Sequence, residues 1–150
     1  MKIIFSLFFL AICSKDCNWG LSQTSIQELD YMTITYEAST RGFYEKTWVT
    51  KDSVSFSADR SLNEVIVSKC QSADWNALIG LVKNINLKDL PELEAPTQMH
   101  QVDGAAMATL TIKLNKETYQ TNIFDHGHPP KAISGLVNKV LSIQKMMPKQ

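Results

Sequence analysis

Residues 31–57 read YMTITYEASTRGFYEKTWVTKDSVSFS, and this stretch decides the fold class. Residues 31–38 alternate between two faces, which is typical of a strand with one buried side. Residues 43–50 and 53–57 repeat the alternation after short segments that carry turn residues. Because short turns join strands that follow one another in space, the stretch predicts a three-stranded antiparallel meander.

The chain beyond the meander adds strands and two helices. Residues 64–69, 105–114 and 118–124 are predicted as further strands. Residues 72–85 carry an apolar stripe at helical spacing, and a last helix is expected to open at the Pro-Pro pair that precedes Lys131. This order predicts an α+β fold: a mostly antiparallel sheet of five or six strands with two helices packed on one face.

The two helices have recognisable starts and stripes. Ser72 is expected to cap the first helix, and Asp74 suits the positive end of its dipole. The apolar stripes consist of Trp75, Leu78, Ile79, Val82 and Ile85 in the first helix, and of Ile133, Leu136, Val137, Val140 and Leu141 in the second. The order contains no β-α-β unit and no glycine-rich phosphate loop, which argues against a nucleotide-binding fold.

The amino-terminal residues predict export. Lys2 gives a charged start, residues 3–13 form an apolar run broken only by a serine, and small residues follow, as in a secretory signal peptide. The run is shorter than the ~20 residues that a transmembrane helix needs. Cleavage after Ser22 would remove residues 1–22 and leave residues 23–150 as a single α+β domain. The expected location is therefore exported: periplasmic, cell-surface or extracellular.

Two other processing routes remain open. Cleavage after Cys13 would keep Cys17 and would permit a Cys17–Cys70 disulfide. Alternatively, residues 10–13 would act as a lipobox, with Cys13 acylated and the chain tethered to a membrane. Ile12 argues against this lipid anchor, because a small residue normally precedes the lipidated cysteine.

Charge and composition narrow the choice of partners. The whole chain holds 15 basic and 15 acidic residues, and residues 23–150 hold 13 and 14. Without a basic excess to neutralise phosphates, nucleic acid is not expected as a partner. No second apolar stretch is long enough to span a membrane.

The histidines form the strongest candidate for a chemical site. Asp125, His126 and His128 lie where a predicted strand ends, and His100 and Asp103 lie just before the neighbouring strand. If these two strands pair as a hairpin, their outer ends meet and the five side chains converge. Imidazole and carboxylate groups are ligands for zinc and other divalent metals, which can activate water for hydrolysis. Turn and capping roles are the competing interpretation, because the spacing matches no named metal motif.

Cys70 is a second candidate, because it immediately precedes the first helix. A helix amino terminus lowers the pKa of a thiol, and one of the histidines could act as its base. A lone cysteine at the end of an apolar strand more often packs as a small buried residue.

Aromatic residues of the first strands are candidates for partner binding. Tyr31, Tyr44 and Trp48 are expected on the sheet face that the helices leave open, where they would suit a protein, peptide or glycan. Cross-strand pairs that stabilise the sheet are the competing interpretation.

Two short segments carry a resemblance. Phe-Asp-His-Gly…Pro-Pro over residues 124–130, with the preceding Asp-Gly-Ala at 103–105, resembles small exported proteins of Bacteroidetes whose activity is uncharacterised. The junction after Ser22, with Gln23 next, is similar to signal-peptide ends in that group. The resemblance implies export and no particular activity.

No complete catalytic constellation can be assembled from these residues. The sequence therefore predicts a non-catalytic exported domain, binding a partner or associated with the cell envelope, without a cofactor. The alternative is a divalent-metal-dependent hydrolase with its site at His100, Asp103, Asp125, His126 and His128.

Overall fold

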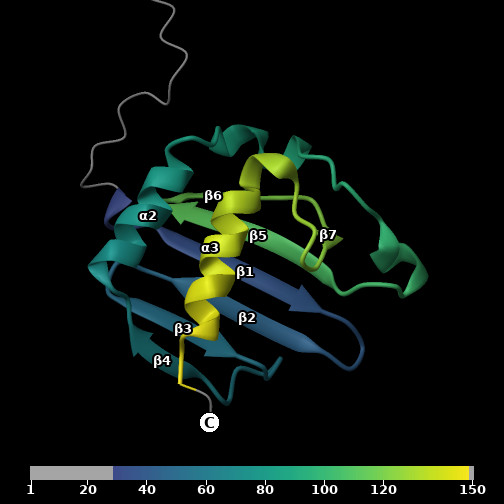
Figure 1. Ribbon diagram of the computed structural model, residues 1–150, viewed down its shortest axis with the longest axis horizontal. Coiled ribbons are helices and arrows are strands. Elements are labelled where there is room, and N and C mark those ends of the chain that lie inside the picture. The colour runs from purple at the N-terminus through teal and green to yellow at the C-terminus, as the bar shows by residue number, and fades with distance from the viewer. Residues whose placement is uncertain (1–28, 149–150) are drawn as a thin grey trace, which may run out of the picture.

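The computed structural model describes residues 29–148, and Figure 1 shows one antiparallel sheet with the helices on one of its faces. This confirms the predicted α+β class. The strands are β1 (Thr33–Ser39), β2 (Tyr44–Val49), β3 (Ser53–Ser57), β4 (Ile66–Lys69), β5 (Met107–Leu114), β6 (Glu117–Gln120) and β7 (Phe124–Asp125). The helices are α2 (Ser72–Val82) and α3 (Ser134–Lys145), with short 3₁₀ turns η1 (Leu87–Glu92), η2 (Met99–Val102) and η3 (Lys131–Ile133). The signal peptide predicted at residues 1–22, with Cys13 and Cys17, lies outside the described residues.

The sheet confirms the predicted meander and places β1 at its centre. Its order is β4-β3-β2-β1-β5-β6, and β7 pairs with β5 beside the end of β6. Every pairing is antiparallel. No helix within residues 29–148 combines the length and apolar character that crossing a bilayer requires.

Alternation along β1 produces the buried face. Ile34, Tyr36 and Ala38 are fully buried beneath the helices, as the sequence predicts. Across the ladder, Ile34 pairs with Ile112 and Tyr36 with Leu110, and both partners are fully buried as well. Burying a side chain of this size contributes about 2 kcal/mol, so these residues stabilise the packing of the sheet against the helices.

Both helices cover this face with their apolar stripes (Figure 1). Trp75, Leu78 and Val82 of α2 are buried, and Leu136, Val137, Val140 and Ile143 of α3 are buried as well. The amine of Lys139 in α3 lies 2.7 Å from Asp74 in α2, so an ion pair joins the two helices. The predicted cap at Ser72 is wrong: Ser72 is the first helical residue, and Gln71 holds the cap position without a side-chain hydrogen bond.

The predicted sixth strand, residues 118–124, is divided into β6 and β7. Thr111 pairs with Gln120, but Ala108 pairs with Phe124, so two residues of β5 oppose three residues of the partner segment. One extra residue is therefore inserted, as in a β-bulge. Thr121 stabilises the bulge, because its backbone N–H donates to Leu110 O and its hydroxyl accepts from Leu110 N.

The bulge explains why the sheet has seven strands rather than the predicted five or six, and it decides which side chains reach the core. A one-residue shift exchanges the two faces of a strand. Phe124 consequently points to the helix-covered face and is fully buried, whereas its neighbour Ile123 is 46% exposed. Asp125 follows and turns towards the segment that precedes β5.

Candidate functional site

Asp125 is a fully buried carboxylate that organises the segment before β5. Its Oδ2 accepts from the Thr97 hydroxyl at 2.5 Å and from Met99 N at 2.8 Å. Its Oδ1 accepts from His100 N at 2.8 Å and from His100 Nδ1 at 2.6 Å. Burial opposes ionisation, but these donors outweigh it and hold the pKa of Asp125 well below its ordinary value.

His100 is oriented by this carboxylate. The ionised Asp125 can only accept, so Nδ1 of His100 carries the proton of this hydrogen bond. The His100 side chain is 12% exposed and lines a groove of about 570 Å³. Within residues 29–148, Nε2 of His100 takes part in no hydrogen bond.

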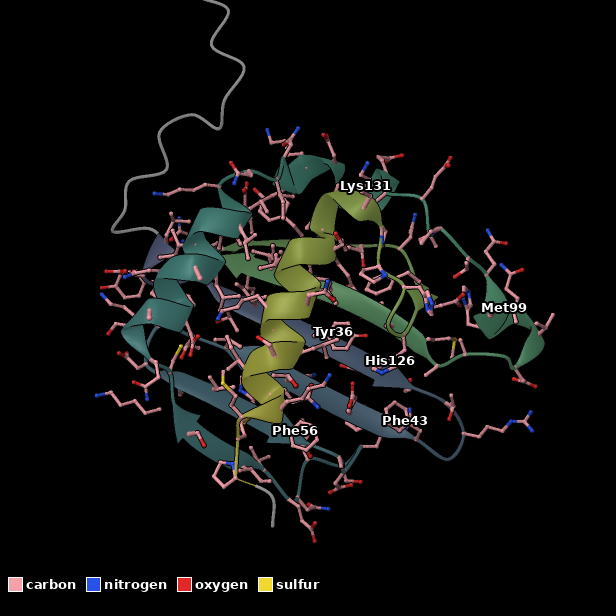
Figure 2. The ribbon with its side chains drawn as sticks, viewed as in Figure 1. Tyr36, Phe43, Phe56, Met99, His126 and Lys131 are labelled. Carbon is pink, nitrogen blue, oxygen red and sulfur yellow. The ribbon has the colours of Figure 1, made fainter. Side chains whose placement is uncertain are left out.

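His126 belongs to a second cluster on the helix-covered side of the sheet. The hydroxyl of Tyr36 and Nδ1 of His126 are hydrogen-bonded at 2.8 Å, and the ring of Phe43 packs edge-on against the imidazole, with 5.7 Å between the ring centres. Figure 2 shows Tyr36, His126 and Phe43 grouped together, with Met99 at a separate edge of the molecule. Glu45 Oε1 lies 3.5 Å from the same Nδ1.

The burial of this cluster affects both Glu45 and Tyr36. Glu45 Oε2 accepts from Gln144 Nε2 of α3 at 3.1 Å, whereas buried Oε1 has no hydrogen-bond partner among the described residues. Burial, followed by the negative charge of Glu45, raises the pKa of Tyr36 well above its ordinary value, and the Gly127 N–H acts in the opposite direction. The Tyr36 hydroxyl therefore stays protonated while it is hydrogen-bonded to His126.

The glycine of the Asp-His-Gly-His segment has a conformational role. Gly127 has φ +82°, and His128 N donates to Asp125 O at 2.8 Å. A positive φ at the third position of such a turn favours glycine. The turn directs Asp125 and His126 to different clusters, so their adjacency in the chain does not make them one site.

Replacing Tyr36 with phenylalanine is expected to lower the free energy of unfolding by about 1 kcal/mol, because the hydrogen bond between the Tyr36 hydroxyl and Nδ1 of His126 is lost. Urea denaturation followed by circular dichroism would measure the change. Tyr44→Phe is the matched control, since the Tyr44 hydroxyl makes no hydrogen bond within residues 29–148. Equal stability of the two variants would show that the Tyr36–His126 bond does not contribute.

The five residues of the metal hypothesis are distributed over several places. His100 and Asp125 are in direct contact, as the predicted meeting of strand ends requires. Asp103 is exposed in a left-handed conformation, with φ +56°, and His128 is exposed in its turn. Within residues 29–148, no group of three or more His, Cys, Asp or Glu side chains is arranged to hold a metal ion. The metal site stays a prediction, with hydrogen-bonding roles now visible for His100, Asp125 and His126.

Cys70 is a buried free thiol, 4% exposed. Burial raises its pKa, and the carboxylates of Asp74 and Asp52 raise it further. Both effects favour the neutral thiol over the thiolate that a nucleophile needs.

The predicted partner-binding aromatics differ in position. Tyr44 and Trp48 lie in β2 on the face opposite the helices, opposite Ser39 and Thr35 of β1, and both are half-buried. Tyr31 precedes β1 and is 80% exposed. The guanidinium of Arg60 lies 5.2 Å from the centre of the Tyr44 ring.

Hydroxyl groups dominate the rest of this face. One row crosses the sheet from Thr111 through Thr35, Trp48 and Ser55 to Val67. We call this surface the open face. Its other strand residues are Thr33, Glu37, Ser39, Tyr44, Lys46, Ser53, Ser57, Lys69, Met107, Thr109, Lys113, Thr118 and Gln120.

No protein-family model matches the chain, and no curated protein matches it in sequence. The functional assignment therefore rests on the residues of this chain.

Sequence reasoning missed Glu45, Thr97 and the role of Tyr36. Alternation along β1 predicted that Tyr36 is buried, and a buried tyrosine hydroxyl needs a partner. From the sequence, this need for a hydrogen-bond partner was the one indication of the contact between Tyr36 and His126. Nothing comparable in the sequence indicated Thr97, because its role depends on the bulge before Phe124.

Proposed function

We propose that this domain is a non-catalytic binding module that holds a saccharide on its open face. The observation that carries the proposal is the pair Thr35–Trp48, in which a half-buried aromatic ring lies next to a hydroxyl on the adjacent strand, with the buried Ser55 on its other side. A sugar ring can pack its apolar side on an indole, and its hydroxyls can exchange hydrogen bonds with serine and threonine.

The composition of the open face favours a saccharide over a protein partner. The cores of protein interfaces are enriched in aromatic residues and methionine and are depleted in serine. Here serine and threonine occupy half of the strand positions, and the charged pair Glu37–Lys46, 3.2 Å apart, lies beside Trp48 rather than at a rim. A ligand that is itself covered with hydroxyls matches such a surface.

The open face offers little for glycoside hydrolysis. Hydrolysis of a glycosidic bond ordinarily requires two carboxyl groups on either side of the bond. Two carboxylates occupy open-face positions of the strands. Glu37 is paired with Lys46, and Asp125, opposite Met107, is fully buried and hydrogen-bonded to Thr97 and His100. Binding without cleavage is the simpler use of these residues.

The expected export of the chain supports the same ligand class. A periplasmic, cell-surface or extracellular domain meets the glycans of envelopes and of the surroundings. The resemblance of residues 124–130 to small exported proteins of Bacteroidetes agrees with this location.

Replacing Trp48 with alanine is expected to weaken oligosaccharide binding by about tenfold, because the stacking platform is lost. The purified protein would be titrated with a panel of neutral and acidic oligosaccharides, and the affinity measured by isothermal calorimetry. The hydroxyl of Thr35 remains in this variant, so residual binding is expected.

Tyr119→Ala is the matched control, because Tyr119 is a half-buried aromatic that pairs with Ile112 on the covered face. It should leave the affinity unchanged at equal folded content, which circular dichroism would verify. The proposal fails if no saccharide of the panel binds, or if both variants weaken binding equally. Capture of a protein through Trp48 in the absence of saccharide would assign the open face to a protein partner instead.

A further inference from the structure

The outermost strand of the sheet, β4, has no neighbour on its outer side in the part of the chain that the structure describes. The sheet order ends at β4, and Figure 1 shows this strand along the lower edge of the view. The opposite end of the sheet differs, because Asn122, which follows β6, donates from Nδ2 to Pro91 O in η1 at 2.6 Å. β4 is therefore the edge to which another strand can be added.

The backbone of β4 directs hydrogen-bonding groups away from the sheet at alternate residues. Cys70 N donates to Asp52 O at 3.0 Å, so Cys70 faces β3. In an antiparallel ladder the N–H and C=O groups of one residue point to the same side, and this side alternates along the strand. Every second residue before Cys70 faces β3 likewise, whereas the backbone groups of Val65, Val67 and Lys69 point outward.

Apolar side chains are exposed along the same edge. Val67 is 63% exposed on the open face, and Val65, which immediately precedes β4, is 37% exposed. Leu62, earlier in the same segment, is 40% exposed. β-branched side chains stabilise a pair of strands when they lie opposite each other. A strand that carries such residues would cover both valines.

An apolar groove lies on the helix-covered side of this edge, between β4 and the end of α3. It encloses about 330 Å³, and its lining consists of Val54, Ile143, Met146 and Met147 with Ser68, Lys69, Gln71 and Asp74. Asp74 is paired with Lys139 at 2.7 Å, whereas Lys69 belongs to no ion pair among residues 29–148. The unbalanced charge of the groove is therefore positive.

We propose that β4 pairs with β4 of a second copy of this chain, antiparallel, across a two-fold axis perpendicular to the sheet. With Ile66 on the axis, Val65 of each copy lies opposite Val67 of the other. The backbone groups of these two residues point outward, so the pair exchanges both hydrogen bonds. With Val67 on the axis instead, Val65 would lie opposite the charged Lys69, so the first register is favoured.

The same register gives the two edges complementary charge. Glu64 lies two residues before Ile66, so its side chain is on the helix-covered side, and it is exposed and belongs to no ion pair in the described part of the chain. In the dimer Glu64 lies opposite Ser68 of the other copy, which lines the groove beside Lys69. Each copy thus brings a carboxylate to the ammonium group of the other. Leu62, on the same side as Glu64, lies next to the apolar wall.

This self-complementarity favours a second copy over an unrelated peptide. A two-fold axis uses each feature twice, because the same patch on both copies meets itself. A strand of 4 residues and a small groove bury less than the roughly 1,600 Å² of a standard interface, so the dimer is expected to be weak. Pairing at β4 does not involve Trp48, so the dimer and the saccharide site can fail separately.

The test is sedimentation velocity of the purified protein without saccharide, at low salt, from about 1 µM to about 1 mM. The mass should rise reversibly from one chain to two, with a Kd on the order of 50 µM. Val67→Pro should weaken the dimer at least about tenfold, because it removes an outward N–H that an edge strand tolerates losing. Val67→Thr keeps this N–H and should dimerise within about threefold of the wild type. Circular dichroism would verify that both variants fold.

Charge reversal tests the register. Glu64→Lys and Lys69→Glu should each weaken the dimer by about tenfold, because like charges then meet at both ends of the strand pair. An equimolar mixture of these two variants should dimerise again, since every charge pair in the mixed dimer is of opposite sign. Glu92→Lys is the matched control: it makes the same change in net charge at an exposed residue of η1, beside β6, and should leave the Kd unchanged.

Three results would overturn the proposal. A mass of one chain up to about 1 mM would show that the edges do not pair. Equal dimerisation of the wild type and Val67→Pro would place the contact on another surface, and a mixture that stays monomeric would contradict the antiparallel register. If the protein stayed monomeric while an unrelated valine-rich peptide shifted the NMR signals of the β4 amides, the edge would belong to a peptide partner.

Discussion

Replacing Asp125 with asparagine is expected to lower the midpoint of thermal unfolding by ~10 °C. The carboxylate receives four donors, two on each oxygen, from Thr97, Met99 and His100. Asparagine has the same shape but only one acceptor oxygen. Whichever way its amide is turned, an NH₂ group faces a backbone N–H that had an acceptor, and a buried unsatisfied donor is costly.

The same substitution is expected to change the acid limb of the stability profile. The folded-state pKa of Asp125 lies below its value in the unfolded chain. Its contribution is therefore fully present above about pH 4 and is lost as the pH falls through the folded-state value. Asp125→Asn should consequently show a smaller loss of stability than the wild type on acidification below about pH 4.

Asp103→Asn provides the control for both measurements. Asp103 is exposed and lies in a left-handed conformation that asparagine also tolerates. The variant should match the wild type in calorimetry and in urea denaturation across the pH range. If Asp125→Asn also matched the wild type, the hydrogen bonds of Asp125 would make no net contribution to stability.

The periodic parts of the fold were predictable from sequence, because they depend on local rules. Alternation in residues 31–57 identifies three strands and their buried faces, since a strand repeats every two residues. The helical stripes of α2 and α3 follow from the period of 3.6 residues. Even the contact between His100 and Asp125 follows from pairing two strand ends.

The bulge was not predictable in the same way. Residues 118–124 carry no glycine or proline to mark an interruption, so they favour one continuous strand. The interruption depends on the tertiary contact between Thr121 and Leu110, which a sequence pattern does not display. The separation of Asp125 from His126 and the groove beside His100 depend on this contact as well.

For the open face as well, the sequence predicted which aromatic residues share a face but not which groups lie next to them. The sequence places Tyr44 and Trp48 on one face, and the register confirms it. The hydroxyls in the row with Trp48, however, come from three other strands, β5, β1 and β3, and their alignment requires the register of each pair. The sequence alone does not show that these serines and threonines lie next to one another.

Replacing Phe124 with alanine is expected to cost about 3–5 kcal/mol, the usual range for a large aromatic in a core. Phe124 is fully buried, and its ring centre lies 6.3 Å from that of Tyr36. The matched control is Ile123→Ala, because Ile123 is the preceding residue and is 46% exposed. That variant should change the free energy of unfolding by less than about 1 kcal/mol in urea denaturation.

This pair of variants tests the bulge as well as the core. If β6 and β7 formed one regular strand, the alternation set by Tyr119 would place Ile123 towards the helices and Phe124 on the open face. The larger loss would then belong to Ile123→Ala. With the bulge at residues 121–123, the larger loss belongs to Phe124→Ala, and it should approach the total stability of a domain of this size. The order of the two losses therefore decides whether the chain shifts register before Asp125, on which the position of His100 depends.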